Sequence, residues 1–398
     1  MSPRVLIPAD IRFPLERANG VQVVKTAAAL ARHGTATTLL VRRSDRRPTS
    51  EILALYGLEP HPGLRVQRLR VLHRRGSFAL PRASFLARAA LAAMGSLRKG
   101  EVVFTRDLQL ADLLLRGRSH ARRAVVYEAH AVEAILYAER ALLYGTGERA
   151  NPAKLCRLQR REARVWRRAA AVVTTTAGIR DSFREAHGDR PRVHVVPNGC
   201  DVPLDRRFGG LAAERPPRVV YAGQLYLWKG IDVLVEAMAL VPEARLVVLG
   251  GLDGERDLLR VRSLVAARGL SDRTEMVGTL PQAQVAAELA RAAVVAVPFL
   301  RTAMTERHTS PLKAFEAMAA GRPIVASDLP SSREFLRHGE NALLVPPGDP
   351  AALAAALRRL LGDPSLAEEL ARKAWHQAPD FSWDARARAL SAVFAELP

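Results

Sequence analysis

One loop in the second half of the sequence places a lysine where it can meet a phosphate. The loop reads AGQLYLWKG over residues 222–230, lies between a strand-like and a helical segment, and contains two glycines. A lysine that follows the carboxyl end of a strand can hold its ammonium group beside an anionic ligand. Lys229 is therefore a candidate phosphate-binding residue, and an ordinary surface lysine is the alternative interpretation.

A second loop leads into a helix that has the features of an anion-binding site. The segment TSPLKAFEAM contains Ser310 and Pro311, an N-cap residue followed by a proline suited to the first helical position. The backbone N–H groups of Leu312 and Lys313 are then expected to point out of the helix end, with the positive end of its dipole. Glu316 lies one turn further and either accepts the two hydroxyls of a ribose or is an exposed helical carboxylate.

The segments around these loops alternate between strands and helices in both halves of the chain. In the first half, strands are expected at residues 4–8, 37–41, 101–105 and 124–128, and a helix at 20–33. In the second half, strands are expected at 218–222, 245–249, 274–278, 294–298 and 323–327, and helices at 231–240, 258–268 and 282–291. Such alternation predicts parallel sheets covered on both faces, an α/β fold with two Rossmann-like domains.

Breaker residues divide the chain near its middle. Residues 191–217 are rich in proline and glycine and include a Pro-Asn-Gly turn, which is typical of an interdomain linker. We therefore expect an N-terminal domain over residues 1–204, a C-terminal domain over 205–375, and a C-terminal helix over 376–398 that packs back on the N-terminal domain. Because open parallel sheets bind ligands at the carboxyl ends of their strands, we expect the site in a cleft where the two domains face each other.

The positive charge of the chain is confined to its first half. The formal net charge is +20 at pH 7; residues 1–200 hold 36 Lys and Arg against 16 Asp and Glu, whereas residues 201–398 hold 24 of each kind. This asymmetry indicates an anionic partner, either a membrane leaflet, an acidic substrate or a nucleic acid, with a merely solvated basic surface as the alternative. The basic residues gather in four segments, 42–47, 65–75, 116–123 and 157–168.

The last of these basic segments has an amphipathic helical pattern. One side of it carries the apolar residues Leu155, Leu158, Val165, Trp166 and Ala169, and arginines surround the rest. This apolar side packs into the core of the N-terminal domain, which is the preferred interpretation, or it inserts into a membrane surface. Because each basic residue near an anionic leaflet contributes about 1 kcal/mol, we expect peripheral docking of the basic half on the inner face of the membrane.

The sequence offers no segment for crossing a membrane. No uncharged stretch approaches the roughly 20 apolar residues that a spanning helix needs. Charged residues near the start leave no apolar signal-peptide region, and the two cysteines, Cys156 and Cys200, make no disulfide framework. We therefore expect a cytoplasmic protein with free thiols.

Several motifs, taken in order along the chain, resemble the family-four glycosyltransferases. The most specific stretch is HTSPLKAFEAMAAGRPIVASDLPSSREFL, which is similar to the branch of that family in which S-P-L-K replaces the more usual E-G-F-G. The segments VVYEAHA, VVPNGCD, LYLWKG and FSWDARARAL match further motifs, so the resemblance spans most of the chain. It implies the GT-B architecture, in which two Rossmann-like domains face each other.

The resemblance also implies roles for individual residues. Lys229 matches the lysine that holds the diphosphate of a nucleotide-sugar donor, and Glu316 matches the glutamate that holds the nucleotide ribose. His130 matches the histidine near the reacting sugar. Gly20 matches the glycine that lets the first helix approach the donor phosphates.

Two positions depart from the family pattern. The family commonly pairs its lysine with an arginine a few residues earlier, and the nearby position here holds Gln224. The first of the family's two glutamates falls on His308, so we take His308 and Glu306 as the candidate contacts to the donor sugar. Three basic residues are candidates for the missing cation: Arg301, Arg307 and Lys313.

The reaction consistent with these parts is transfer of a hexosyl-type group from a UDP- or GDP-linked sugar to an acceptor hydroxyl. The leaving diphosphate gains negative charge, which Lys229 and the amides of Leu312 and Lys313 can stabilise without a metal or a cofactor. The resemblance implies retention of the anomeric configuration, and no carboxylate pair suited to a covalent intermediate is apparent. We therefore expect a same-face displacement, with a lipid-linked or anionic glycan as acceptor.

Other functions stay open at this point. A nucleotide-sugar epimerase or a phosphorylase can use the same fold, and the residues His308 and Gln224 also fit an inactive sugar-nucleotide-binding paralogue. A nucleic-acid-binding protein is an alternative of another class, supported only by the charge. Aromatic residues make up 5% of the chain and no groove-reading motif is present, which disfavours that alternative.

Overall fold

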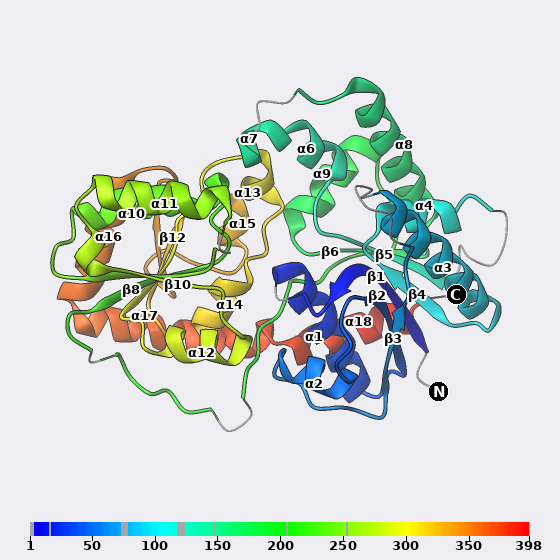
Figure 1. The fold of residues 1–398 in the computed structure, drawn as a ribbon, viewed down its shortest axis with the longest axis horizontal. Helices are drawn as coiled ribbons and strands as arrows, with labels where there is room; N and C mark the ends of the chain where they lie inside the picture. The colour runs from blue at the N-terminus through cyan, green and yellow to red at the C-terminus, as the bar shows by residue number, and fades with distance from the viewer. Residues whose placement is uncertain are drawn as a thin grey trace. The chain divides into compact units, whose positions relative to one another are not determined.

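The computed structural model describes residues 4–15, 17–72, 79–117, 124–145, 149–203, 206–212, 214–251 and 254–397. These residues form two compact units, each built on a parallel sheet with helices against it (Figure 1). Unit 1 consists of Met1–Ala134, Asn151–Gly199 and Trp383–Pro398, and unit 2 of Ile135–Ala150 and Cys200–Ser382. The domain boundary expected at residue 205 lies outside the described residues, as do parts of two basic segments, 73–75 and 118–123.

Within the described ranges, unit 1 contains a sheet of seven parallel strands in the order β3-β2-β1-β4-β5-β6-β7. The strands are β1 (Val5–Phe13), β2 (Thr37–Arg43), β3 (Leu64–Leu69), β4 (Val102–Thr105), β5 (Val125–Ala129), β6 (Ala171–Thr174) and β7 (Val193–Val195). Strands β4, β5 and β6 are buried along their whole length. Burial on both faces explains why their sequences are nearly continuous apolar runs.

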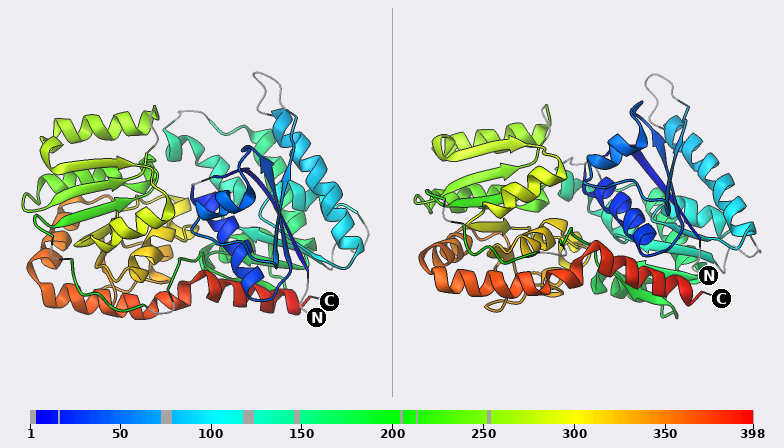
Figure 2. Two further views of the ribbon diagram at one scale, coloured as in Figure 1. Left: turned by 60° about the horizontal axis from the view of Figure 1, so that its bottom comes forward. Right: turned by 90° about the horizontal axis from the view of Figure 1, so that it is seen from below.

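Helices of unit 1 pack on this sheet and on one another. They are α1 (Ala18–Arg32), α2 (Thr49–Ala54), α3 (Ala79–Arg98), α4 (Leu108–Leu114), α8 (Pro152–Arg168), α9 (Ala177–His187) and α18 (Trp383–Ala395), and α6 (Glu133–Ala138) crosses into unit 2. Helices α1 and α18 lie side by side (Figure 2). Helix α1 therefore has neighbours on two sides, the sheet and α18, which is why it is buried from Gly20 to Ala31.

The apolar side of α8 belongs to the core of unit 1. Val165 and Trp166 are buried, and the ring of Trp166 stacks on Phe183 with centroids 5.2 Å apart. The indole Nε1 of Trp166 donates to the carbonyl oxygen of Gly188 at 2.8 Å. This packing confirms the preferred interpretation of the amphipathic pattern. No helix in the described ranges has the length and apolar character that crossing a bilayer requires.

The described part of unit 2 contains a sheet of six parallel strands in the order β10-β9-β8-β11-β12-β13. The strands are β8 (Arg218–Ala222), β9 (Arg245–Leu249), β10 (Thr274–Gly278), β11 (Val294–Val297), β12 (Ile324–Ser327) and β13 (Leu343–Val345). Strands β8, β9 and β10 have the predicted bounds. Two parallel α/β units are thus present, and the predicted fold class is confirmed.

Helices cover both faces of the unit 2 sheet. They are α7 (Arg140–Tyr144), α10 (Ile231–Ala239), α11 (Arg256–Ala267), α12 (Gln282–Ala290), α13 (Ala303–Arg307), α14 (Leu312–Ala319), α15 (Pro330–Arg333), α16 (Pro350–Gly362) and α17 (Pro364–Gln377), with short 3-10 turns at Leu227–Lys229, Ser271–Arg273 and Ala378–Phe381. Side chains of β8 alternate between two cores. Val219 and Tyr221 pack with α10, α11 and α16, whereas Val220 packs with α12 and α14.

Candidate active site

The Lys229 loop follows β8 and depends on the glycine at its end. Residues 227–229 form a single 3-10 turn that stops at Gly230, whose φ of 70° lies in the left-handed region. A Cβ atom at this position would stand 1.7 Å from the carbonyl oxygen of Pro298, so only glycine fits where the loop meets the end of β11. The Lys-Gly pair of the motif therefore fixes the loop against a neighbouring strand end.

Lys229 is half-buried, and no carboxylate among the described residues pairs with it. In the described part of the chain, no oxygen accepts a hydrogen bond from its Nζ, which lies 5.1 Å from the centroid of the Trp228 ring. Burial, and then the positive charge of Lys313, lower the pKa of Lys229 from 10.5 to about 8. An ammonium group without a partner among the described residues, and subject to the charge of a second lysine, is a candidate to bind an anion.

Two further polar atoms of this loop are buried without partners. The indole Nε1 of Trp228 and the side-chain Oε1 of Gln224 have no hydrogen-bond partner among the described residues. Buried polar groups in proteins are nearly always hydrogen-bonded, and an unmade bond costs about 1–3 kcal/mol. The loop thus carries a cation, a donor and an acceptor that a polar ligand can satisfy.

Helix α14 begins one residue later than the sequence predicts. Its N-cap is Pro311, whose ψ of 113° is extended, and the prediction that Ser310 is the N-cap is wrong. The reason is that Pro311 keeps this extended backbone, so Leu312 is the first residue with helical dihedral angles. The amides of Leu312 and Lys313 find no acceptor within the described ranges. The free N–H groups required for an anion site are therefore present at the start of α14.

Glu316 lies one turn into α14 and is held by two side chains. Its Oε2 accepts from Lys313 Nζ at 2.7 Å, and its Oε1 accepts from Gln282 Nε2 at 3.0 Å. Gln282 is the first residue of α12, and its Oε1 also accepts from Lys313 Nζ at 3.4 Å. A carboxylate has about four acceptor positions, so Glu316 can still accept ribose hydroxyls. Gln282 was not predicted as a site residue. Its only signal in the sequence is its place at the start of the helix that follows β10.

His308 and Glu306 lie on and after α13, the short helix that follows β11. His308 is buried, and burial followed by the charge of Arg307 lowers its pKa to about 4, so its imidazole is neutral at pH 7. Glu306 forms an ion pair with Arg301. At the position where the resemblance implies a carboxylate, the chain thus has a neutral ring, and the nearby carboxylate of Glu306 already has a cation.

In unit 1, His130 lies directly beyond the carboxyl end of β5. Its Nε2 is 3.1 Å from Glu128 Oε2 but lacks the alignment of a hydrogen bond. Burial, and then the charge of Arg106, hold the pKa of His130 well below its usual value. The imidazole is therefore neutral at pH 7, and it can offer a hydrogen bond without adding charge.

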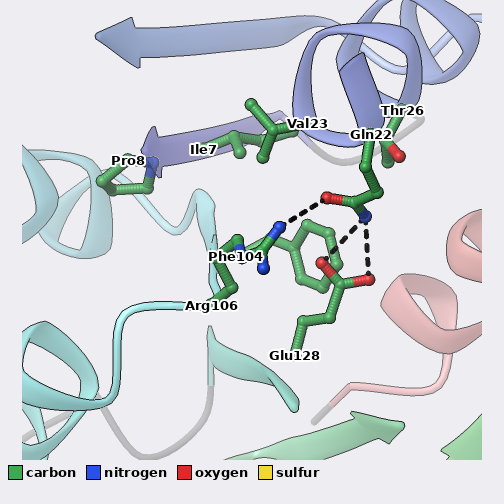
Figure 3. A pocket seen from close by; sticks show the side chains of 8 residues that line it. All are labelled: Ile7, Pro8, Gln22, Val23, Thr26, Phe104, Arg106 and Glu128. Carbon is green, nitrogen blue, oxygen red and sulfur yellow. Dashed lines mark hydrogen bonds between the residues drawn. The ribbon is translucent and has the colours of Figure 1, made fainter. Parts of the chain in front are cut away.

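Glu128 is the centre of a buried polar cluster in unit 1. Arg386 of α18 forms an ion pair with it, and the two side chains are 1% and 2% exposed. Gln22 Nε2 lies 3.3 and 3.4 Å from the two carboxylate oxygens, and Gln22 Oε1 accepts from Arg106 at 3.1 Å (Figure 3). The side chains of Gln22, Arg106 and Glu128 line a small pocket together with Ile7, Pro8, Val23, Thr26 and Phe104. The sequence analysis missed Arg386, although it lies in the matched segment FSWDARARAL.

Gly20 lies in the first turn of α1, in unit 1. A Cβ atom at this position would stand 1.9 Å from the carbonyl oxygen of Leu15, so the close approach of the preceding segment requires glycine. Its role towards donor phosphates stays a prediction. Of the predicted site residues, Gly20 and His130 thus belong to unit 1 and the other six to unit 2.

Two family models match the chain. The model described as "Glycosyl transferase 4-like domain" matches residues 19–199, and the model described as "Glycosyl transferases group 1" matches residues 216–363. Together they cover most of both units. The chain belongs to the family-four glycosyltransferases.

Individual relatives agree with this class. A D-inositol 3-phosphate glycosyltransferase of Xylanimonas cellulosilytica is 34% identical over 242 residues, which are 57% of each chain, so this chain matches little more than half the length of that relative. Sucrose-phosphate synthase of Thermosynechococcus elongatus is similar over 100% of this chain and 99% of its own, with a TM-score of 0.75 and 23% identity. Anabaena HepE in complex with UDP and glucose covers 99% of this chain and 100% of its own, at a TM-score of 0.73 and 18% identity. At these identities the structures show the fold, which is GT-B.

Proposed function

We propose that this glycosyltransferase moves a hexosyl group from a nucleoside diphosphate sugar to an acceptor hydroxyl with retention of configuration. The observation that carries the proposal is the half-buried ammonium of Lys229 after β8, combined with the amides at the start of α14 after β11, since neither has a partner among the described residues. Strands β8 and β11 are neighbours in one parallel sheet, so both features lie at the same edge of that sheet. A diphosphate fits this arrangement because it brings negative charge and several acceptor oxygens.

The nucleotide would extend from the diphosphate towards Glu316. The carboxylate of Glu316 accepts the ribose hydroxyls in this proposal, and Lys313 and Gln282 keep its two oxygens in place. Structures of Anabaena HepE contain UDP and UDP-glucose, which makes UDP the first nucleotide to test and GDP the second. This arrangement supports the use of a nucleotide sugar as the donor. It also supports the assignment of this chain to the S-P-L-K branch of the family.

The chemical step would depend on charge stabilisation at the leaving group. Negative charge grows on the diphosphate as the glycosidic bond breaks, and Lys229 with the amides of Leu312 and Lys313 receives it. These groups supply the positive charge from the protein itself, so we propose that the step needs no metal. The donor phosphate then assists deprotonation of the acceptor on the same face of the sugar, which gives retention.

The donor sugar would be held by residues that differ from the family pattern. His308 presents a neutral imidazole, and Glu306 is paired with Arg301, so hydrogen bonds rather than an unpaired carboxylate meet the sugar hydroxyls on this side. His130 is the proposed contact near the reacting carbon, and its neutral ring suits a hydrogen bond to a hydroxyl. Gly20 completes the proposed donor contacts by keeping the start of α1 free of a side chain.

The acceptor is proposed to be anionic or attached to an anionic membrane. Seven of the 17 residues of α8, PAKLCRLQRREARVWRR, are basic, and its one acidic residue, Glu162, is buried. The relative from Xylanimonas is named for D-inositol 3-phosphate, a phosphorylated polyol, and an acceptor of that kind would suit the same basic surface. We expect the protein to dock peripherally on the inner face of the membrane. Sedimentation with anionic vesicles at low salt tests this expectation, and an unbound protein would contradict it.

A thermal-shift screen of UDP, GDP and their sugars tests the proposed function. A ligand present at 100 times its dissociation constant adds about 2.7 kcal/mol to the free energy of unfolding, which raises the melting temperature measurably. We expect a shift with one diphosphate and its sugar, followed by turnover of that sugar. Binding without turnover of any donor would identify an inactive nucleotide-sugar-binding protein, and the absence of any shift would contradict the donor site.

A further inference from the structure

A segment from the first half of the chain is built into unit 2. Residues 135–145, here called the bracing segment, follow unit 1 at Ala134 and contain helix α7. Leu143 of this segment is fully buried in the core that also contains Trp228 and Phe315. The bracing segment is thus a fixed part of the unit that contains Lys229.

Glu139 of the bracing segment caps helix α13. Its Oε1 accepts from the backbone N–H of Ala303 at 3.0 Å, and its Oε2 lies 3.3 Å from the N–H of Met304, which donates to it. No cation pairs with Glu139 in the described part of the chain. Its negative charge is therefore compensated by the amide groups and the positive end of α13.

Helix α13 depends on such a cap because it is short. It has five residues, and an isolated helix of that length is unstable since nucleation costs more than one turn of hydrogen bonds returns. The side chain of Thr302 satisfies only the N–H of Thr305, at 3.0 Å. Glu139 accepts from the first two amides of the helix, so the N-terminal turn is complete only with a residue 164 positions away in the sequence.

The bracing segment also contacts the loop that carries Lys229. The rings of Tyr144 and Tyr226 meet edge to face with centroids 5.4 Å apart. A Cβ atom at Gly145 would stand 3.0 Å from Leu227 Cδ1, so the end of α7 lies directly on the Lys229 turn. One segment thus packs on the Lys229 loop and caps the helix that leads to His308.

We propose that Glu139 is a positioning residue that sets the orientation of α13 and, through it, of Glu306 and His308 at the donor sugar. This inference rests on the proposed function, because it assigns α13 to the sugar half of the donor site. Among the described residues, Glu139 forms hydrogen bonds with α13 and none with Lys229 or Glu316. Its loss therefore affects recognition of the sugar and leaves recognition of the nucleotide intact.

The test compares Glu139→Ala, Glu139→Gln and the control Arg140→Ala in the full chain. Arg140 is the next residue, is exposed, and forms no side-chain hydrogen bond or ion pair with the part of the chain that the structure describes. Titration measures the affinity for UDP and for UDP-glucose, or for the GDP pair if the screen selects it. Hydrogen exchange measures the protection of the amides at 303–307.

In Glu139→Ala we expect faster exchange at 303–307 and a fivefold to tenfold weaker affinity for the nucleotide sugar, about the effect of losing a helix cap. Affinity for the free nucleotide stays within about twofold. Glu139→Gln keeps one acceptor oxygen and gives an intermediate result, and Arg140→Ala behaves as the unmodified protein.

Unchanged exchange in Glu139→Ala would overturn the capping role. Faster exchange with equal losses for nucleotide and nucleotide sugar, or with no loss for either, would overturn the positioning role. These outcomes are distinct from failure of the proposed function, which would show as no binding of either nucleotide by the unmodified protein. In that case the sugar-positioning inference falls with it.

Discussion

Two cations inside this protein, Arg386 in unit 1 and Lys229 in unit 2, have opposite surroundings. Arg386 forms an ion pair with Glu128, donates to Thr26 Oγ1 at 3.0 Å, and reaches two backbone carbonyls at 2.8 and 2.7 Å. Lys229 donates to no group in the described residues and lies near a second lysine. A charge removed from water needs compensation. Arg386 has its charge compensated by groups of the fold, whereas Lys229 would have its charge compensated by a bound ligand.

This difference separates structural charges from binding charges in one molecule. Arg386 joins α18, α1 and β5, so removal of its side chain should weaken folding. Lys229 forms no hydrogen bond or ion pair with the residues that the structure describes, so its removal should weaken binding while folding is unaffected or improves.

Replacement of Arg386 by methionine should lower the free energy of unfolding by about 3–5 kcal/mol, because it leaves the buried carboxylate of Glu128 without its cation. Urea denaturation measures the change. The matched control is Arg388→Met, since Arg388 is exposed on the same helix and should alter stability by less than about 0.5 kcal/mol. Equal free energies of unfolding for the two variants would contradict the claim that Arg386 stabilises the fold.

Lys229→Met should reduce turnover of the selected nucleotide sugar by about a hundredfold to a thousandfold, because the leaving diphosphate loses its ammonium partner. The ligand-free protein should unfold at the same or a higher denaturant concentration. Steady-state kinetics and urea denaturation measure the two effects. Lys373→Met, a surface lysine paired with Glu369, is the control and should retain full activity. A variant at 229 that unfolds easily would show that Lys229 is structural.

Glu316→Gln should weaken UDP affinity by about tenfold to a hundredfold, because hydrogen bonds to a charged group contribute about 1.5–3 kcal/mol. Affinity for inorganic pyrophosphate should not fall, since this probe has no ribose and Lys313 is released from its carboxylate partner. Calorimetric titration of both ligands measures the difference. The exposed Glu369→Gln serves as control. Parallel losses for UDP and pyrophosphate would place Glu316 at the phosphates instead.

The pH dependence of UDP binding should follow Lys229. Its pKa of about 8 lies below the value of 10.5 for a free lysine, so the ammonium loses its proton as the pH rises through 8. Binding favours the charged form, and UDP affinity should fall about tenfold between pH 7 and pH 9. Lys229→Met should show a flat profile in that range. The unfolded chain binds more protons between pH 8 and 10.5, so this group also makes the free protein more stable as pH rises there.

The sequence predicts most of the fold because its central strands are short apolar runs between helices. It does not predict β3, because the sequence LRVQRL places two arginines and a glutamine among three apolar residues and is typical of a basic surface segment. Strands β7 and β13 have three residues each, too few for a pattern. Edge strands and very short strands depend on their neighbours in the sheet, and local sequence does not contain that information.

The same limit applies to the site. Lys229 and Glu316 are predicted because each lies in a local motif after a strand. Their partners and the supporting residues are brought by the fold: Arg386 lies 258 positions from Glu128, and Glu139 lies 164 positions from the helix it caps. A pattern in the sequence cannot join residues that far apart, so the structure is needed to find them.

The most direct test of the donor site is a crystal structure of the protein with UDP. We expect the diphosphate to accept hydrogen bonds from Lys229 Nζ and from the amides of Leu312 and Lys313, with the ribose hydroxyls at Glu316. UDP bound to a different part of unit 2 or to unit 1, with Lys229 still unpaired, would contradict the account.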